Sequence, residues 1–381
     1  MAPQPGRRAV VRVPVATLWT APEAVRPIDC PALAGSPDVA AWIAGMDRDQ
    51  LVGDCVLTQL LLGEPVRVTE TRPDGWVRVV ALGQPAAKLG ADGYPGWLRA
   101  AHLADPADAG PSSTHPADAG PAGPALSGTV PAGPAGTGPS GPGPSGPGPS
   151  GSGPSGSGPS GSGPSGPVPA GTGSAGSGTG PAGTGSAADR PLTVDVAHTA
   201  LRAGPDGDAA LTGVVLGTRL TPAGPAVDGT RPVRVPGRPE PLWATEDDLV
   251  PLPAERPEAE KVLAVAERLR DLVYVWGGMS TAGIDCSGLV HLAWRRYGIT
   301  LPRDADDQAA ATSRVPLDAE RPGDLYFFAR PGRRIHHVGI VSAEPRGGRR
   351  RMLHACYLTR RVVEEELPAD RTATLVGAHR V

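Results

Sequence analysis

The sequence predicts an α+β domain at the C-terminal end of the chain, preceded by two small β-barrels that a long linker separates. Three observations lead to this fold class. Glycine and proline are abundant, at 53 and 46 of 381 residues. The aromatic residues gather towards the two ends, and none lies between Trp97 and Trp243. Alternating apolar and polar residues dominate the first part of the chain, whereas helical spacing appears only after residue 256.

Residues 8–104 are predicted to form the first small β-barrel. Residues 65–70 and 76–80 alternate between apolar and polar side chains, and Pro73-Asp74-Gly75 joins them. Two alternating runs connected by a short Asp-Gly loop predict a β-hairpin. Residues 191–254 repeat this pattern more faintly, at 192–196 and 232–235, and we interpret them as a second small barrel.

Residues 105–190 are predicted to be a disordered linker of Pro, Ser, Gly and Ala. From Ala119 to Ala188 there is no charged and no aromatic residue, and Pro-Ser-Gly recurs at intervals of five residues. Such a composition cannot bury enough apolar surface to offset the entropy lost on ordering. We therefore expect this segment to tether its neighbours without fixing their positions.

Residues 256–381 have the pattern of an α+β domain. Helical spacing predicts a first helix over 258–269 and a second over 286–297, with Asp285 as its N-cap and Gly298 as its stop. Strands are predicted at 324–328, 337–341 and 352–355. Helices followed by strands indicate that the two kinds of element form separate layers.

Charge and composition exclude several kinds of partner. The net charge of −3 gives no reason to expect nucleic acid or an anionic membrane. The four cysteines are too few for a disulfide scaffold, and no stretch reaches the roughly 18 apolar residues that a spanning helix needs. The N-terminal segment lacks an uninterrupted apolar region of about 7–15 residues, so we expect no export signal and a cytoplasmic location. We also expect a monomer without a cofactor.

The candidate chemistry centres on Cys286, in the segment Asp285-Cys286-Ser287-Gly288. A cysteine in the first turn of a helix meets unpaired N–H groups and the positive end of the helix dipole. Both favour the thiolate, which is the attacking form. The alternative is a buried structural cysteine, and the glycines on both sides together with the histidines downstream argue against it.

Two predicted strands that carry histidines follow Cys286 in the same domain, with the adjacent His336 and His337 at the first and His354 on the second. A Cys–His pair whose imidazole is oriented by a third polar group is the generalised acyl-transfer triad. Successive strand residues face opposite sides, so only one of His336 and His337 can face the cysteine, and periodicity does not decide which. His354, near the end of a strand, is available as the orienting group.

A zinc site is the other interpretation of these side chains. Cys286, His337, His354 and Cys356 form a Cys₂His₂ set. The long separation between residues 286 and 337 lacks the close Cys-x₂₋₄-Cys pairing of structural zinc sites. We therefore expect no metal.

The order of several short motifs over residues 258–380 resembles that of the NlpC/P60 cysteine peptidases. The motifs are Tyr274-Val275-Trp276-Gly277-Gly278, Asp285-Cys286-Ser287-Gly288-Leu289-Val290, Leu301-Pro302-Arg303, Arg321-Pro322-Gly323-Asp324-Leu325 and His336-His337-Val338-Gly339-Ile340. The resemblance implies a papain-like α+β catalytic domain with Cys286 as nucleophile, His337 as base and His354 as the third member. It also implies that Tyr274, Asp285 and Ser287 line the substrate pocket.

The two upstream barrels extend this resemblance. Bacterial SH3-like modules before such a domain resemble the γ-D-glutamyl-L-diamino acid endopeptidases, the dipeptidyl-peptidase VI-like subgroup. The resemblance to this subgroup implies that the first module contacts the free N-terminal L-Ala of the substrate. Tyr94 and Glu64 are the candidate residues for this contact in the present sequence. Ala305 departs from the pattern because some members have serine at this place, and the long linker between the barrels is a second departure.

The resemblance implies a hydrolase acting on murein peptides (muropeptides). The thiol would attack the γ-D-glutamyl–diamino acid bond, and water would release the resulting acyl-enzyme. One alternative is a secreted endopeptidase or amidase that acts on the intact cell wall, as the wall-associated type of linker suggests. The other, of a different class, is a murein-binding protein with an inert peptidase domain.

Overall fold

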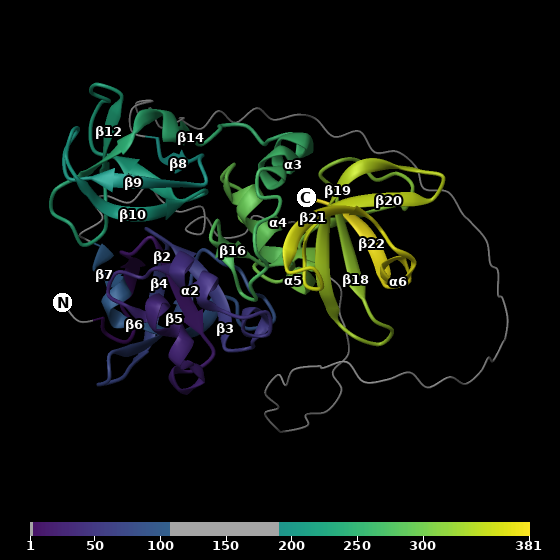
Figure 1. The fold of residues 1–381 in the computed structure, drawn as a ribbon, viewed down its shortest axis with the longest axis horizontal. Helices are drawn as coiled ribbons and strands as arrows, with labels where there is room; N and C mark the ends of the chain where they lie inside the picture. The colour runs from purple at the N-terminus through teal and green to yellow at the C-terminus, as the bar shows by residue number, and fades with distance from the viewer. Residues whose placement is uncertain (1–2, 107–189) are drawn as a thin grey trace, which may run out of the picture. The chain divides into compact units, whose positions relative to one another are not determined.

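The computed structural model describes residues 3–106 and 190–381. Almost all of the predicted linker therefore lies outside the described residues. The described parts comprise two β modules followed by an α+β module, which Figure 1 shows in purple to blue, teal, and green to yellow.

The first module is a seven-stranded antiparallel sheet with the strand order β3-β2-β6-β5-β4-β1-β7. Its strands are β1 (Arg8–Val11), β2 (Val15–Trp19), β3 (Val56–Leu61), β4 (Pro65–Thr71), β5 (Trp76–Ala81), β6 (Tyr94–Arg99) and β7 (Leu103–Ala104). The predicted hairpin is confirmed, because β4 pairs with β5 from Val66↔Ala81 to Thr71↔Val77. Gly75 takes a φ of +82° in the connecting turn, a conformation that favours glycine.

The structure contains two short helices between β2 and β3, namely α1 (Cys30–Leu33) and α2 (Val39–Gly45). The sequence analysis, which predicted a small β-barrel here, did not predict them. Asp38 caps α2, since its Oδ1 accepts a hydrogen bond from the Ala41 N–H at 2.9 Å. Trp42 on this helix packs against Trp19 of β2, with ring centroids 5.7 Å apart. The helix is too short to give a clear periodic signal, and tertiary packing of Trp42 stabilises it.

The second β module repeats the topology of the first. Its strands are β8 (Leu192–Val194), β9 (His198–Arg202), β10 (Ala209–Val215), β11 (Arg219–Pro222), β12 (Thr230–Arg234), β13 (Leu242–Thr245) and β14 (Leu249–Pro251). Their order, β10-β9-β13-β12-β11-β8-β14, is that of the first module with every strand number raised by seven. The two modules are therefore the same fold, although the aromatic residues of the first are nearly missing from the second.

The C-terminal module combines helices with a six-stranded sheet of order β17-β22-β18-β19-β20-β21 (Figure 1). The helices are α3 (Ala259–Glu267), α4 (Cys286–Arg295), α5 (Ala305–Ala310) and α6 (Ala369–Thr372). The strands of the sheet are β17 (Ser313–Val315), β18 (Leu325–Ala329), β19 (Ile335–Arg346), β20 (Arg349–Cys356), β21 (Arg361–Glu366) and β22 (Leu375–Arg380). A separate ribbon of β15 (Met279–Ser280) and β16 (Gly283–Ile284) precedes α4.

The helices and strands predicted for this module are present with small differences at their ends. The first helix is two residues shorter at its C-terminal end than the predicted 258–269, and α4 ends at Arg295 before a last turn that leads to Gly298. Gly298 has a φ of +83°, as expected of a residue that stops a helix. The strand β19 is far longer than the predicted 337–341, because it continues into a hairpin with β20.

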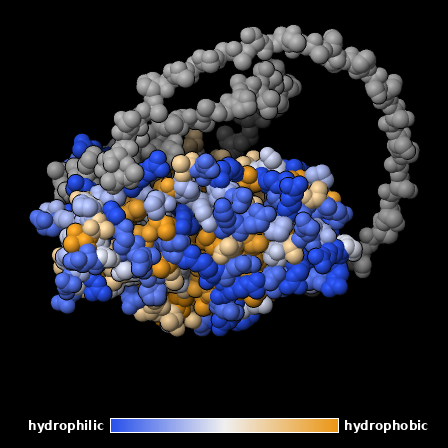
Figure 2. Space-filling model, turned by 90° about the horizontal axis from the view of Figure 1, so that it is seen from above, coloured by the Kyte–Doolittle hydropathy of each residue, from blue (hydrophilic) through white to orange (hydrophobic). Residues whose placement is uncertain are grey.

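One hydrophobic core joins the first module to the helices of the C-terminal module. Trp19 and Trp42 belong to the same buried cluster as Leu289 and Val290 of α4, and all described residues fall within one compact unit. Among residues 3–106 and 190–381, no helix combines the length and hydrophobicity needed to cross a membrane. On the face drawn in Figure 2, hydrophobic residues lie in small groups among hydrophilic ones.

Candidate active site

The start of α4 is fixed by the side chain of Asp285. Its Oδ1 accepts a hydrogen bond from the Gly288 N–H at 2.6 Å, and its Oδ2 accepts one from the Gly277 N–H at 3.0 Å. Gly288 has no room for a side chain, since a Cβ there would lie 2.3 Å from the carbonyl oxygen of Gly278. The predicted N-cap is confirmed, and the Asp-Cys-Ser-Gly segment is explained by local geometry: a cap, a helix start and a glycine at a close approach.

Arg303 holds Asp285 in place from the other side. Its guanidinium makes two hydrogen bonds to the carboxylate, Nη1 to Oδ1 at 3.0 Å and Nη2 to Oδ2 at 2.6 Å. Nη1 also donates to Ser287 Oγ at 3.0 Å. Burial disfavours the charge on Arg303, but the neighbouring Asp285 carboxylate raises its pKa above the usual value. The predicted pocket residues Asp285 and Ser287 thus have their polar atoms engaged with a buried arginine.

The thiol of Cys286 is the first side chain of α4 and is 7% exposed. Burial raises the pKa of Cys286 to about 12, and the negative charge of Asp285 adds to this effect. Hydrogen bonds from the backbone of Val338 and Ser287 act in the opposite direction. The expectation of a stabilised thiolate is therefore wrong for the resting protein, because desolvation outweighs the helix start. The resting group is a thiol.

The two adjacent histidines of β19 have different environments. His337 is buried, and its Nε2 lies 2.7 Å from Nδ1 of His354 on β20. His336 is exposed. The pairing of β18 with β19 shifts its register between His337 and Ile335, and this irregularity falls at His336. The backbone of Val338, the residue that follows His337, lies close enough to the thiol of Cys286 to lower its pKa.

Burial lowers the pKa of His337 well below 6.5, and the neighbouring His354 and Arg371 add to this shift. Burial also lowers the pKa of His354, although a hydrogen bond to Glu365 opposes the change. Both imidazoles are therefore neutral at neutral pH. A neutral imidazole beside a thiol has the protonation states that general-base catalysis requires.

Glu365 on β21 is a member of the cluster that the sequence analysis missed. Its Oε1 lies 3.1 Å from Nε2 of His354 and 3.4 Å from Nε of Arg371. His354 has no exposed side-chain surface, whereas Glu365 is 30% exposed. The only signal in the sequence is the run Glu364-Glu365-Glu366, which also describes an ordinary solvated strand.

Tyr274 lies near the thiol and is buried. Burial raises the pKa of Tyr274 well above 10, and the neighbouring Cys286 and Asp285 add to this shift. The ring meets Tyr357 edge-on, with centroids 5.8 Å apart. The hydroxyl is thus a permanent hydrogen-bond donor near Cys286.

The first β module contacts the residues around α4 directly. Gln59 Oε1 accepts a hydrogen bond from the Met279 N–H at 2.9 Å. Arg303 Nε donates to Thr58 Oγ1 at 2.7 Å, and the Arg303 N–H donates to the carbonyl of Pro85 at 3.0 Å. The arginine that holds Asp285 is therefore also held by the first module.

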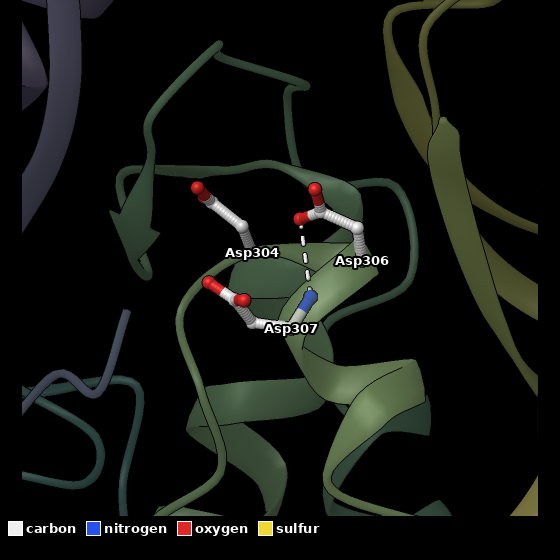
Figure 3. Close-up of side chains that lie close together, drawn as sticks. All are labelled: Asp304, Asp306 and Asp307. Atoms are coloured by element: carbon white, nitrogen blue, oxygen red, sulfur yellow. Dashed lines mark hydrogen bonds between the residues drawn. The ribbon is translucent and has the colours of Figure 1, made fainter. Parts of the chain in front are cut away.

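A second set of contacts forms at the start of α5. Lys88 Nζ lies 2.9 Å from Asp304 Oδ2 and 2.6 Å from Asp306 Oδ1, and Tyr94 Oη donates to Asp304 Oδ2 at 3.1 Å. Figure 3 shows Asp304, Asp306 and Asp307 with their carboxylates close together. Their oxygen atoms lie within 4.8 Å of one another, the spacing of a metal site. The ammonium of Lys88 pairs with two of these three carboxylates, so the cluster contacts the first module through ion pairs.

The interpretation of Glu64 needs correction. Glu64 is only 1% exposed, and it pairs with Arg295 of α4 at 3.1 Å and with the Gln84 amide at 3.3 Å. It cannot receive the amine of a substrate, because its carboxylate is buried against an arginine. In the described part of the chain, the zinc alternative has no geometric support either. His337 and His354 hydrogen-bond to each other, and the Cys356 Sγ accepts a hydrogen bond from Arg371 Nη2 at 3.8 Å.

Comparisons with known proteins show what this chain is similar to. Residues 271–375 match the NlpC/P60 family, and residues 53–103 match the bacterial dipeptidyl-peptidase SH3 domain. The γ-D-glutamyl-L-lysine dipeptidyl-peptidase of Bacillus subtilis (strain 168) is 25% identical over 94% of this chain and 96% of its own length. A protein with the same name from Bacillus cereus (strain ATCC 10987) is 24% identical over 87% of this chain and 80% of its own length.

A crystal structure of an NlpC/P60 family protein from Bacillus cereus ATCC 10987 has the same fold. The TM-score is 0.68 at 23% identity, with 98% of this chain and 99% of that chain covered. The α+β module therefore has the NlpC/P60 fold, and the N-terminal module is an SH3-like β domain. The strand order of the second module assigns it the same SH3-like topology.

Proposed function

We propose that this chain is a cysteine peptidase that cleaves the γ-D-glutamyl–diamino acid bond of peptidoglycan-derived peptides through a covalent acyl-enzyme. The observation that carries the proposal is the buried His337–His354 hydrogen bond, on a strand whose Val338 backbone lies close enough to the thiol of Cys286 to lower its pKa. The names of the relatives that match almost the whole chain supply the substrate class.

In the proposed reaction, the neutral thiol and the neutral imidazole exchange one proton as the substrate reacts. His337 takes the proton of Cys286 while Sγ attacks the γ-carbonyl carbon of D-glutamate. The imidazolium then gives this proton to the amine of the diamino acid, which leaves as the C–N bond breaks. A water molecule, deprotonated by His337, attacks the thioester and restores the thiol, with the dipeptide released as its carboxylate.

The three predicted pocket residues have different parts in this proposal. Tyr274 offers its hydroxyl proton to the substrate near the reacting carbonyl, since it stays protonated throughout the physiological range. Asp285 and Ser287 act through Arg303, which they hold in the buried network at the start of α4. Removing one partner of such a buried ion pair would leave an uncompensated charge, so these residues position Cys286.

The first SH3-like module limits the substrate to peptides with a free N-terminus in this proposal. Its contacts through Gln59, Lys88 and Tyr94 lie at both ends of the segment that contains Cys286 and α5. The relatives are dipeptidyl-peptidases by name, and such enzymes remove two residues from a free amino end. Free peptides are then the substrates, and the intact wall is not.

The test is the mapping of products from three substrates with the purified full-length chain. We expect L-Ala-γ-D-Glu-L-Lys, or its diaminopimelate counterpart, to give L-Ala-D-Glu and the free diamino acid. The N-acetylated peptide should react at least about tenfold more slowly, and intact sacculi should release nothing. Cleavage of sacculi at a rate equal to that of the free peptide would instead support the wall endopeptidase. Binding to sacculi without cleavage of any peptide would support an inert binding protein.

A further inference from the structure

Three acidic or basic side chains occupy one face of three neighbouring strands in the C-terminal module. His354 of β20 is paired with Val363 of β21, so Glu365, two residues further on, points to the same face as His354. His337 of β19 approaches His354 closely enough for a hydrogen bond. Gly339 leaves space beside this pair, since a Cβ there would lie 3.2 Å from Cβ of His354.

The hydrogen bonds run in one line from β19 to β21. His337 Nε2 is 2.7 Å from His354 Nδ1, and His354 Nε2 is 3.1 Å from Glu365 Oε1. Each neutral imidazole carries one proton, on either Nδ1 or Nε2. An ionised carboxylate can only accept a hydrogen bond. The contact with Glu365 therefore requires the proton of His354 to be on Nε2.

The position of this proton determines the rest of the line. With its proton on Nε2, His354 accepts at Nδ1, so His337 must donate from Nε2. The Nδ1 of His337 then has a free lone pair. In the opposite arrangement, His354 would donate from Nδ1 to Nε2 of His337, whose proton would be on Nδ1. No lone pair would then remain to take the proton of the thiol.

We propose that Glu365 is a positioning residue that sets the tautomers of His354 and His337 and thereby keeps Nδ1 of His337 free to accept the thiol proton. With Glu365, the proposed catalytic group has four members, one more than a Cys–His–polar triad. Glu365 touches neither the thiol nor the substrate and acts only through His354.

Arg371 of the α6 segment supports this role. Its Nε lies 3.4 Å from Glu365 Oε1, and the side chain is largely buried. The hydrogen bond with His354, followed by the charges of His354 and Arg371, lowers the pKa of Glu365. The carboxylate is therefore ionised at neutral pH, where His337 is neutral. His336, the preceding residue of β19, also acts to lower the pKa of His337.

The expected effect of Glu365 on kcat rests on the proposed peptidase function. The expected tautomers of His354 and His337 do not depend on that function. The variant is Glu365→Gln, because an amide has nearly the same shape but can either donate to His354 or accept from it. We expect kcat to fall about 10- to 100-fold, the usual effect of removing a group that orients a histidine through its second nitrogen, with KM nearly unchanged. Glu365→Asp, which keeps the carboxylate, should recover part of this loss.

The matched control is Glu366→Gln on the next residue of the same strand. Glu366 pairs only with the exposed Arg349 among the described residues, so kcat should stay within about twofold of wild type. Nitrogen-15 NMR of the histidine rings supplies a readout that needs no substrate. Wild type should show His354 protonated at Nε2, and Glu365→Gln should show a mixture of tautomers.

The outcomes separate the two proposals. If wild type cleaves no peptide but the NMR signals change as described, the peptidase proposal fails and the role of Glu365 stands. An unchanged His354 tautomer together with wild-type kcat in Glu365→Gln would overturn the role of Glu365 and leave the peptidase proposal intact. A loss of kcat with an unchanged tautomer would also overturn it, because Glu365 would then act by another route.

Discussion

Replacing Cys286 with alanine is expected to reduce kcat by about 10⁴- to 10⁶-fold, the range seen when a nucleophile is removed from a catalytic triad. The reason is that the proposed acyl-enzyme forms on the thiol of Cys286, which alanine lacks. The measurement is the rate of diamino acid release from L-Ala-γ-D-Glu-L-Lys. A Cys286→Ala variant with more than a few per cent of the wild-type rate would contradict the assignment.

Cys30→Ala is the matched control for this experiment. Cys30 is exposed at the start of α1 in the first module, and its loss should leave kcat unchanged. The melting temperatures of both variants should stay close to that of wild type. Labelling with iodoacetamide, mapped by peptide mass spectrometry, should detect modification of Cys286 in wild type that active-site ligands suppress, whereas labelling of Cys30 should be indifferent to them.

The second large effect is expected at His337. Alanine at this position removes the general base, which typically costs about 10²- to 10⁴-fold in rate, and more when the triad acts as a unit. His336→Ala should stay within about twofold of wild type, because His336 is exposed and lies at the register shift of β19. Comparison of kcat for the two variants decides between the adjacent histidines. An equal loss in both would show that neither alone is the base.

The pH profile of wild type follows from the same assignment. A protonated His337 cannot accept the thiol proton, so kcat/KM should fall as the pH drops through the pKa of His337. Burial and the neighbouring His354 and Arg371 lower this pKa well below 6.5, and the fall should therefore occur on the acid side of the usual histidine range. The profile should stay flat from there to neutral pH. A loss of activity already at pH 7 would indicate a charged imidazole at neutral pH and contradict this environment.

The features that the sequence predicts correctly are those with a local cause. The Asp285 cap requires only a side chain that reaches back to the Gly288 N–H, and the hairpin from β4 to β5 requires only a turn at Gly75. The topology of the second module is harder to predict from sequence, because its short strands show little alternation of apolar and polar residues. The first module supplied the pattern by which the second could be interpreted.

The missed features depend on strand register and on contacts between modules. Glu365 becomes visible only when β21 is placed beside β20 with His354 opposite Val363. Arg303 is close in sequence to α5, yet its partners include Thr58 of the first module. The burial that raises the pKa of Cys286 likewise comes from the packed protein, and a helix-start argument cannot include it.

The choice between His336 and His337 depends on both the sequence and the structure. Alternation along a strand states that the neighbours face opposite sides, but it does not state which side holds the partner. The resemblance to the NlpC/P60 peptidases implied His337, and the structure supplies a physical reason: His337 is the buried one and has His354 as its hydrogen-bond partner.

The most direct test of the account is a competition between water and hydroxylamine for the acyl-enzyme. If Cys286 carries the γ-D-glutamyl group as a thioester, wild type in the presence of hydroxylamine should convert L-Ala-γ-D-Glu-L-Lys into the γ-hydroxamate of L-Ala-D-Glu. Mass spectrometry identifies this product and therefore also the bond that was cleaved, and Cys286→Ala should form neither hydroxamate nor free dipeptide. Release of lysine with only the free dipeptide as co-product, even at saturating hydroxylamine, would contradict a covalent intermediate and with it the central claim.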